Sequence, residues 1–188
     1  MKILFIHKGF PGQFKHLIPK LQERGDQLTC INPYRSSKNH LKGVTYYPYK
    51  VQRGNGQGVH PLALETESKV LRGEAVGQIA DQISCQGYTP DLILAHPGWG
   101  ESLFLKDIWE KTPQLHYVEF AYKFHGADTD FPDRYSMEQS WRENARVRMK
   151  NANVLINLES MSWGLTPTAF QKSTLPKWAQ SKTSIIHE

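Results

Sequence analysis

The sequence has little cysteine and no long apolar run. Two cysteines, Cys30 and Cys85, occur among 188 residues, which indicates reduced cytosolic thiols and not a disulfide framework. No apolar run approaches the length of a membrane span, so we expect no transmembrane helix. The apolar run at residues 1–6 is too short for the core of a signal peptide. These absences together predict a cytoplasmic protein.

Several motifs of known chemistry are also missing. The dinucleotide fingerprint G-x-G-x-x-G is absent, which disfavours a nicotinamide-dependent oxidoreductase, and the G-K-[ST] of a P-loop is absent too. The eight histidines show neither H-x-x-x-H nor H-E-x-x-H spacing, so we predict no zinc site. No G-x-S-x-G elbow supports a hydrolase. Asp128 and Asp130 fall in an expected loop, where aspartates are far more often solvated or capping groups than a metal pair.

Positive charge is in modest excess. The net charge is +5 and the pI is about 9.1. A basic surface suits an anionic partner, such as a phosphate-bearing ligand, a membrane surface or nucleic acid. For so small an excess, a contribution to solubility is an equally good interpretation. No arginine-rich block or nucleic-acid-binding motif is present, so we expect no nucleic-acid partner.

One arrangement of residues occurs twice. The apolar run at residues 2–6 leads into His7-Lys-Gly-Phe-Pro-Gly-Gln-Phe14, and the run at 91–95 leads into His96-Pro-Gly-Trp-Gly-Glu-Ser102. We call residues 7–14 the first elbow and residues 96–102 the second elbow. An apolar run bounded by turn residues is typical of a strand buried on both faces. In parallel α/β sheets, ligands sit beyond the carboxyl ends of the strands, so both elbows are expected to face one crevice.

The rest of the chain extends this pattern without a linker or an internal repeat. We predict a single domain over residues 1–188, with a Rossmann-like, open and mostly parallel α/β sheet that carries helices on both faces. The expected strands are residues 2–7, 28–31, 44–49, 92–95, 115–120, 154–156 and 184–186. The expected helices are residues 13–24, 61–86, 101–109 and 137–150, with a further helix start at residues 166–170.

Two of the expected helices carry details that a structure can test. Pro19 lies inside the helix at residues 13–24 and is expected to kink it, and Gly25 is expected to end it. The long helix at residues 61–86 has apolar positions that roughly follow helical spacing, namely Leu64, Val70, Leu71, Val76, Ile79, Ala80 and Ile83.

The first elbow is chemically suited to a phosphate or diphosphate. Gly9, Pro11 and Gly12 let the backbone approach a ligand closely, and the following helix offers N–H groups. Lys8 and Lys15 flank the elbow, and no acidic residue does. A tight strand-to-helix turn without any ligand explains the same residues equally well.

The second elbow suits hydroxyl groups. Glu101 falls in the first turn of the expected helix, where a carboxylate would repel phosphate. Glu101 and His96 can both accept a hydrogen bond from a sugar or polyol, and Trp99 can stack on a sugar ring. The alternative is a capped helix, a packed indole and a core histidine. Glu119 should open onto the same crevice, where it either binds a hydroxyl or pairs with a nearby Arg or Lys.

Four segments together resemble the amino-terminal domain of a bacterial group of family 4 glycosyltransferases. They are the first elbow, Ala95-His-Pro-Gly-Trp-Gly-Glu-Ser-Leu-Phe104, Glu119-Phe-Ala-Tyr122 and Thr166-Pro-Thr168. The resemblance covers the whole chain, and residues 95–104 are its most specific part. It implies a GT-B enzyme of two Rossmann-like domains that transfers a sugar with retention of configuration. It also implies that the donor-binding carboxyl-terminal domain is absent from this chain, which alone would be inactive.

The resemblance also assigns roles to residues. His96 matches a catalytic histidine near the transferred sugar and the acceptor. The loop that would face the donor diphosphate consists of Gly9, Phe10, Pro11, Gly12 and Gln13. The acceptor-binding side would consist of Trp99, Gly100, Glu101, Glu119 and Tyr122. No metal and no cofactor is implied for this domain.

Substrates and partners follow from the same resemblance. The full enzyme would use a nucleotide-diphosphate sugar and a sugar or lipid-linked acceptor of cell-envelope polysaccharide. Basic domains of this superfamily can dock on the inner face of the membrane, and the helix at residues 13–24 suits such a contact, although an ordinary solvated basic face explains it too. The second hypothesis is a stand-alone, non-catalytic binding domain that pairs with a separate donor-binding subunit.

Overall fold

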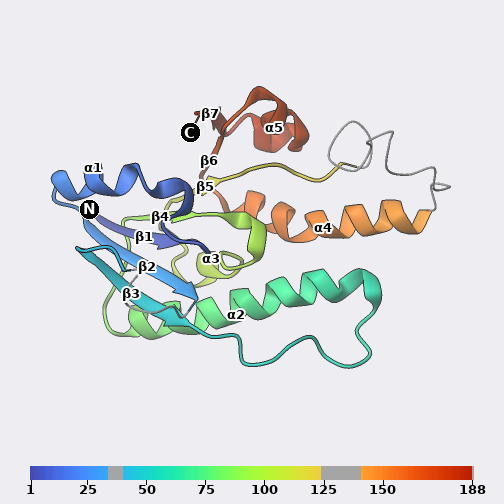
Figure 1. The fold of residues 1–188 in the computed structure, drawn as a ribbon, viewed down its shortest axis with the longest axis horizontal. Coiled ribbons are helices and arrows are strands. Elements are labelled where there is room, and N and C mark those ends of the chain that lie inside the picture. Colours follow the sequence, from blue (N-terminus) through green and yellow to red (C-terminus); the bar gives the residue numbers. More distant parts are fainter. Residues whose placement is uncertain (34–39, 124–140, 188) are drawn as a thin grey trace.

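Seven parallel strands form the centre of the molecule. The computed structural model describes residues 1–33, 40–123 and 141–187. The strand order is β3-β2-β1-β4-β5-β6-β7, and all neighbouring pairs are parallel (Figure 1). The strands are β1 (Lys2–Ile6), β2 (Gln27–Pro33), β3 (Val44–Tyr49), β4 (Leu92–Ala95), β5 (Gln114–Tyr117), β6 (Trp163–Thr166) and β7 (Thr183–Ile185). The predicted Rossmann-like α/β fold is confirmed.

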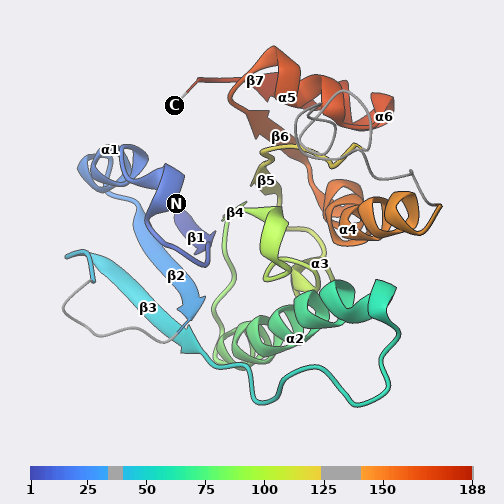
Figure 2. The same ribbon diagram turned by 45° about the vertical axis from the view of Figure 1, so that its right-hand side comes forward.

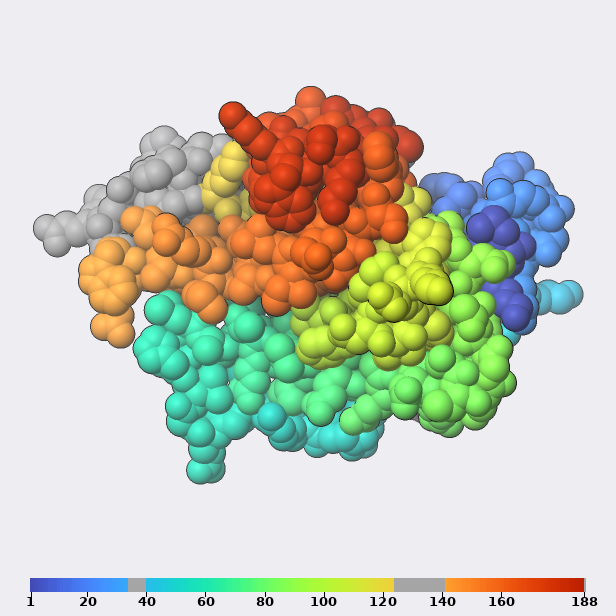
Figure 3. Space-filling view, turned by 180° about the vertical axis from the view of Figure 1, so that it is seen from behind, coloured from blue at the N-terminus to red at the C-terminus, as the bar shows by residue number. Residues whose placement is uncertain are grey.

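Helices cover both faces of the sheet. One face carries α1 (Leu17–Glu23), and the other carries α2 (Leu64–Cys85) and α3 (Leu105–Ile108) (Figure 1, Figure 2). Helix α4 (Trp141–Ser160) lies beside α2, as Figure 3 shows from behind. The remaining helical segments are η1 (Gly12–Phe14), η3 (Pro61–Ala63), η4 (Pro97–Trp99), α5 (Ala169–Thr174) and α6 (Lys177–Gln180).

Strand β1 is buried on both faces, as its continuous apolar run predicts. Ile3 and Phe5 pack in the cluster under α1, whereas Leu4 and Ile6 pack in the cluster under α2. Side chains alternate between the two faces of a strand, so one short run contributes to two cores. Because both faces are covered, β1 is held firmly in the middle of the sheet.

The segment around α1 differs from the prediction. Instead of one helix over residues 13–24, the chain makes the 3₁₀ turn η1 and then the seven-residue α1. Pro19 lies in the first turn of α1, where its missing N–H is not needed, so the expected kink is wrong. Gly25 has a φ of 83°, and its predicted role at the helix end is confirmed.

The predicted strand at residues 154–156 is wrong. These residues lie inside α4, where Val154 is buried and Leu155 and Ile156 are exposed. A run of three apolar residues is too short for its period to separate helix from strand. The sixth strand is β6, and its exposed Trp163 and small Gly164 do not make an apolar run. The residues of the predicted helix at 137–150 that precede α4 lie outside the described part of the chain.

Helix α2 presents a mixed face to the sheet. Its buried positions include Lys69, Gly73, Val76, Ala80 and Ile83, which follow one another at steps of four, three, four and three residues. Two other residues were expected on this apolar face, but Leu64 and Val70 are exposed. Along this stripe, the end of α2 that carries Lys69 therefore buries polar and small residues, whereas the other end buries hydrocarbon.

The order of the strands places a crevice beside β1. The chain adds β2 and β3 on one side of β1 and then crosses to add β4 and the later strands on the other side. At such a reversal, neighbouring loops at the carboxyl ends of the strands leave in opposite directions and open a space between them. The first and second elbows follow β1 and β4, and they therefore flank this switch point.

Candidate functional site

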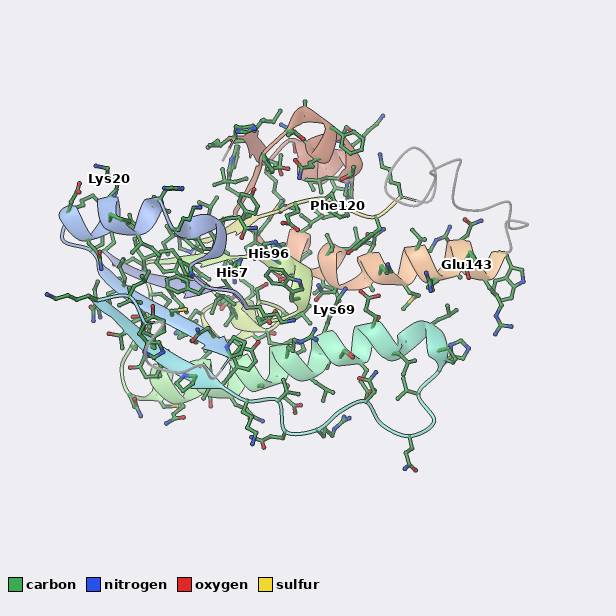
Figure 4. All side chains as sticks on the ribbon, in the orientation of Figure 1. His7, Lys20, Lys69, His96, Phe120 and Glu143 are labelled. Carbon is green, nitrogen blue, oxygen red and sulfur yellow. The ribbon has the colours of Figure 1, made fainter. Side chains whose placement is uncertain are left out.

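The two elbows meet at the carboxyl ends of β1 and β4. Ile6 is the register partner of Ala95, and each of these residues is followed directly by a histidine. The rings of His7 and His96 lie with centroids 5.5 Å apart and are nearly perpendicular. Figure 4 shows the two side chains next to each other, with Lys69 close by. The predicted side-by-side placement of the elbows is confirmed.

Each elbow fixes the orientation of its histidine in the same way. The backbone N–H of Gly9 donates to His7 Nδ1 at 2.9 Å, and the N–H of Gly98 donates to His96 Nδ1 at 3.1 Å. Because Nδ1 acts as the acceptor, the neutral ring carries its proton on Nε2. In both rings Nε2 is therefore the donor nitrogen.

Gln13 and Glu119 connect the two histidines. His7 Nε2 donates to Gln13 Oε1 at 2.8 Å, and Gln13 Nε2 donates to Glu119 Oε1 at 3.4 Å. His96 Nε2 lies 3.5 Å from Glu119 Oε2, which is longer than a strong charge-assisted hydrogen bond. Among the residues that the structure describes, the buried His96 Nε2 makes no hydrogen bond.

The carboxyl group of Glu119 is ionised at neutral pH. The His96 N–H that points toward it lowers the pKa of Glu119, and this effect outweighs burial, which acts in the opposite direction. The Glu119 side chain is 40% exposed, so a ligand can reach it. Glu119 is therefore a solvent-accessible hydrogen-bond acceptor, and Gln13 connects it to His7.

A cavity of about 400 Å³ opens beside His96. This volume lies in the range of small-molecule sites. Its walls come from α2 (Glu65, Ser68, Lys69, Arg72), from residues 96–99 of the second elbow, from residues 118–120 and Tyr122 after β5, and from Val154 of α4. The Trp99 ring stacks on the His96 ring at 4.1 Å, so one face of the indole is already covered.

Not all the predicted acceptor residues line this cavity. Trp99, Glu119 and Tyr122 do, whereas Gly100 and Glu101 do not. Glu101 is 1% exposed and accepts a hydrogen bond from the Tyr49 hydroxyl at 2.7 Å. Its expected place in a helix is also wrong, because α3 begins only at residue 105. The structure thus places Glu101 in the core and not at the surface of the cavity.

Gly100 lies where the second elbow packs against α2. Its φ is 101°, and a Cβ on this residue would collide with the backbone of Lys69. The glycine therefore lets the second elbow approach α2 closely. The same approach lets Arg72 donate from Nη1 to the carbonyl of Trp99 at 3.2 Å.

The predicted donor loop is more closed than the sequence suggested. The N–H groups of Gly9 and Phe10 donate to the Nδ1 and the carbonyl of His7. The Phe10 side chain is buried against Phe5, and a Cβ on Gly12 would collide with the His7 ring. The cavity lining includes none of the five predicted donor-loop residues at positions 9–13. The first elbow reaches the site only through the side chains of His7 and Gln13.

Tyr122 is held in place by α4. Its N–H donates to Asn151 Oδ1 and its carbonyl accepts from Asn151 Nδ2, both at 2.7 Å. The ammonium group of Lys150 lies 4.9 Å from the centre of the Tyr122 ring, a cation–π distance. These contacts fix the segment after β5 as a wall of the cavity.

Sequence reasoning missed the cationic wall formed by Lys69 and Arg72. Helical periodicity could have identified Lys69, because it lies on the same stripe of α2 as Val76, Ala80 and Ile83. A charged residue on an otherwise buried stripe indicates either a paired charge or a site. That the stripe of α2 ends beside the second elbow depends on the tertiary structure.

Two further features of the described residues concern metal-binding clusters and membrane-spanning helices. Within residues 1–33, 40–123 and 141–187, no three His, Cys, Asp or Glu side chains gather in a way that could hold a metal ion. The candidate pair Asp128 and Asp130 lies outside these ranges. No helix in the described ranges is both long enough and apolar enough to cross a bilayer.

Comparison with known proteins agrees with this architecture. A model of the glycosyl transferase family 4 group matches residues 25–188. No curated protein matches the chain by sequence. The solved structures similar to it include the UDP-GlcNAc 2-epimerase of Methanocaldococcus jannaschii, at 14% identity and a TM-score of 0.57, with 98% of this chain and 45% of that chain covered.

Two glycosyltransferases are among the other similar structures. MurG of Acinetobacter baumannii is 15% identical with a TM-score of 0.55, and 98% of this chain covers 45% of it. CalG4, the calicheamicin glycosyltransferase, is 14% identical with a TM-score of 0.52, and 99% of this chain covers 52% of it. At these identities the likeness shows the fold alone. The chain spans about half the length of these structures.

Proposed function

Because the chain belongs to the glycosyl transferase family 4 group, we propose that it is the acceptor-binding domain of a retaining glycosyltransferase. The complete enzyme would move a sugar from a nucleotide-diphosphate sugar to an acceptor hydroxyl. The donor would be bound by a second α/β domain, and the crevice beyond β1 and β4 would face that domain. The acceptor would be a sugar or a lipid-linked molecule.

One observation carries this proposal. The cavity brings together His96, Trp99, Glu119 and Tyr122, which come from two elements separated in the sequence. An N–H donor, a carboxylate acceptor and aromatic surfaces are the groups that bind a sugar with its many hydroxyls. We assign to a sugar ring the face of Trp99 that does not stack on His96.

The chemical role of His96 follows from its hydrogen bonds. Its Nδ1 accepts from the Gly98 N–H, so the neutral ring has no free nitrogen lone pair with which to remove a proton. We therefore assign His96 to donation of a hydrogen bond from Nε2 to a sugar oxygen near the reacting centre. A preorganised donor of this kind stabilises charge that develops in the transition state.

Glu119 takes the complementary role. Its ionised carboxylate can accept a hydrogen bond from the acceptor hydroxyl and hold that oxygen in position for attack. Gln13 orients the carboxylate by donating a hydrogen bond from Nε2 to Glu119 Oε1. Glu119 is thus proposed as an acceptor-positioning group whose placement depends on both elbows.

The donor diphosphate is proposed to lie against the first elbow. Support comes from its position at the switch point and from the absence of acidic residues in its sequence. The N–H groups of Gly9 and Phe10 are already used inside the turn. Binding would then depend mainly on nearby positive side chains, such as the exposed Lys15, and we expect this chain alone to bind nucleotide sugars weakly.

The test is His96→Ala in an enzyme that contains this chain together with its donor-binding domain. Loss of one preorganised donor should lower kcat by about 100-fold or more. Thermal unfolding should show that the variant remains folded. His60→Ala is the matched control, since His60 is exposed on a surface turn and should leave kcat unchanged. An unchanged kcat in His96→Ala would remove His96 from the site.

A further inference from the structure

The α2 wall of the cavity carries two positive side chains one helical turn apart. Lys69 and Arg72 both line the cavity, and residues three apart lie on one face of a helix. The lining also includes His96 and the carboxylate of Glu119. The cavity lining therefore combines two cations on α2 with groups suited to a hydroxyl.

Lys69 is buried, and its ion pair is unequal. Its side chain is 8% exposed, whereas that of its partner Glu65 is 45% exposed, and the two charged atoms are 2.9 Å apart. Lys69 Nζ also lies 3.5 Å from the carbonyl of Lys150. A half-exposed carboxylate loses little when it turns to water. An anion entering the cavity can therefore take the place of Glu65 beside Lys69.

Arg72 has no carboxylate partner within the described residues. No described Asp or Glu lies within ion-pair distance, and the contact that fixes the guanidinium is its Nη1 hydrogen bond to the neutral carbonyl of Trp99. A guanidinium offers five N–H donors in a planar fork that matches phosphate and carboxylate groups. Arg72 therefore has donors left for a ligand in a cavity of about 400 Å³.

We propose that Lys69 and Arg72 form a subsite for an anionic group on the acceptor, so that the acceptor is a sugar phosphate or a sugar acid. This inference rests on the proposed function, because it takes the cavity to be the acceptor site. The hydroxyl that receives the sugar would lie at His96 and Glu119. The phosphate or carboxylate would lie at Arg72 and Lys69, and its charge would fix which hydroxyl reaches the reacting centre.

Titration of the chain with four probes tests the subsite. The probes are glucose, glucose 6-phosphate, glucuronate and UDP, followed by NMR at the Trp99 indole and the Arg72 side chain. We expect at least one of the two anionic sugars to bind about tenfold or more tightly than glucose, because hydrogen bonds to charged groups are the stronger ones. The difference between glucose 6-phosphate and glucuronate identifies phosphate or carboxylate as the group recognised.

Arg72→Gln should remove most of the preference for the anionic sugars over glucose. Lys69→Met keeps the apolar stem of the side chain. This variant should bind glucose 6-phosphate and glucuronate more weakly, while Glu65 turns to solvent. The matched control is Lys111→Gln. Lys111 is exposed just before β5, at the amino ends of the strands and therefore away from the elbows. Its substitution removes the same charge without touching the cavity.

Three results would overturn the proposal. One is equal binding of glucose and both anionic sugars, another is a preference that survives in Arg72→Gln, and the third is displacement of glucose 6-phosphate by UDP from the Arg72 site. The first two leave the His96→Ala test of the proposed function untouched. Conversely, anion binding that depends on Arg72 in an enzyme that transfers no sugar would support the subsite and contradict the proposed function.

Discussion

The two elbows have similar sequences and opposite surroundings. Each has a histidine after a buried strand, then glycine, proline and an aromatic residue. In the first elbow Phe10 and Phe14 are buried in the core under α1. In the second elbow Trp99 lines the cavity and stacks on His96. The same local pattern therefore produces a closed turn at β1 and a cavity wall at β4.

The difference arises from what packs behind each elbow. The first elbow continues into η1 and α1, whose apolar side chains close over β1. The second elbow packs against α2 at Gly100 and Gly73, where missing side chains let the two backbones approach. The polar stretch of α2 then faces the elbow, and the space beside it stays open. Neighbouring helices, and not the elbow motif, decide which elbow lines the cavity.

The largest expected effect concerns the aromatic residue of each elbow. Phe14→Ala should lower the free energy of unfolding by about 3–5 kcal/mol, because it leaves a cavity beside Phe5. Trp99→Ala should cost only about 1 kcal/mol, roughly the value of its stacking contact, while it weakens sugar binding. Urea denaturation of both variants measures the contrast. Equal losses of stability would mean that the second elbow is as closed as the first.

The next effect concerns the close approach of the second elbow to α2. Gly100→Ala places a side chain at a φ of 101° and against the Lys69 backbone, and should destabilise the fold by about 3 kcal/mol. The control is Gly54→Ala, since a Cβ on Gly54 would meet no atom within 4 Å, and it should change stability by about 0.5 kcal/mol or less. If Gly100→Ala is as mild as the control, α2 does not set the shape of the cavity.

The smallest effect concerns the strand beside each elbow. Ile6 is paired with Ile31 on β2, whereas Ala95 is paired with His116 on β5. Burial, with smaller contributions from the charges of His96 and Lys182, lowers the pKa of His116 from 6.5 to about 3. Between these pH values the unfolded chain binds a proton that the folded chain does not. The free energy of unfolding therefore contains the full contribution of His116 above about pH 6.5, and this contribution falls as the pH drops.

This loss should amount to at most about 1.4 kcal/mol per pH unit for the one group. His116→Gln cannot take up the proton, so its unfolding free energy should fall less steeply between about pH 6 and pH 4. Urea denaturation across this range compares the two slopes, with the other histidines present in both proteins. Parallel slopes would show that His116 does not contribute to the loss of stability in acid.

Much of the fold could be predicted because strong local patterns agree with it. The apolar runs of β1 and β4 and the length of α2 gave clear signals. Weak patterns failed, since Val154 and its two neighbours suit a helix as well as a strand, and β6 has no apolar run. Glu101 was expected in a helix and at the cavity, but it pairs with Tyr49, which lies 52 residues away in the chain.

The sequence alone determined that two histidine elbows follow buried parallel strands, because side-chain alternation and turn residues act over a few positions. Only the tertiary structure decided that these strands are neighbours, that Glu119 and Gln13 join their histidines, and that Lys69 and Arg72 line the same cavity as His96. Such contacts link distant residues, and they depend on the packing of whole helices against the sheet. No local pattern encodes that packing, so the cavity forms only when the chain is folded.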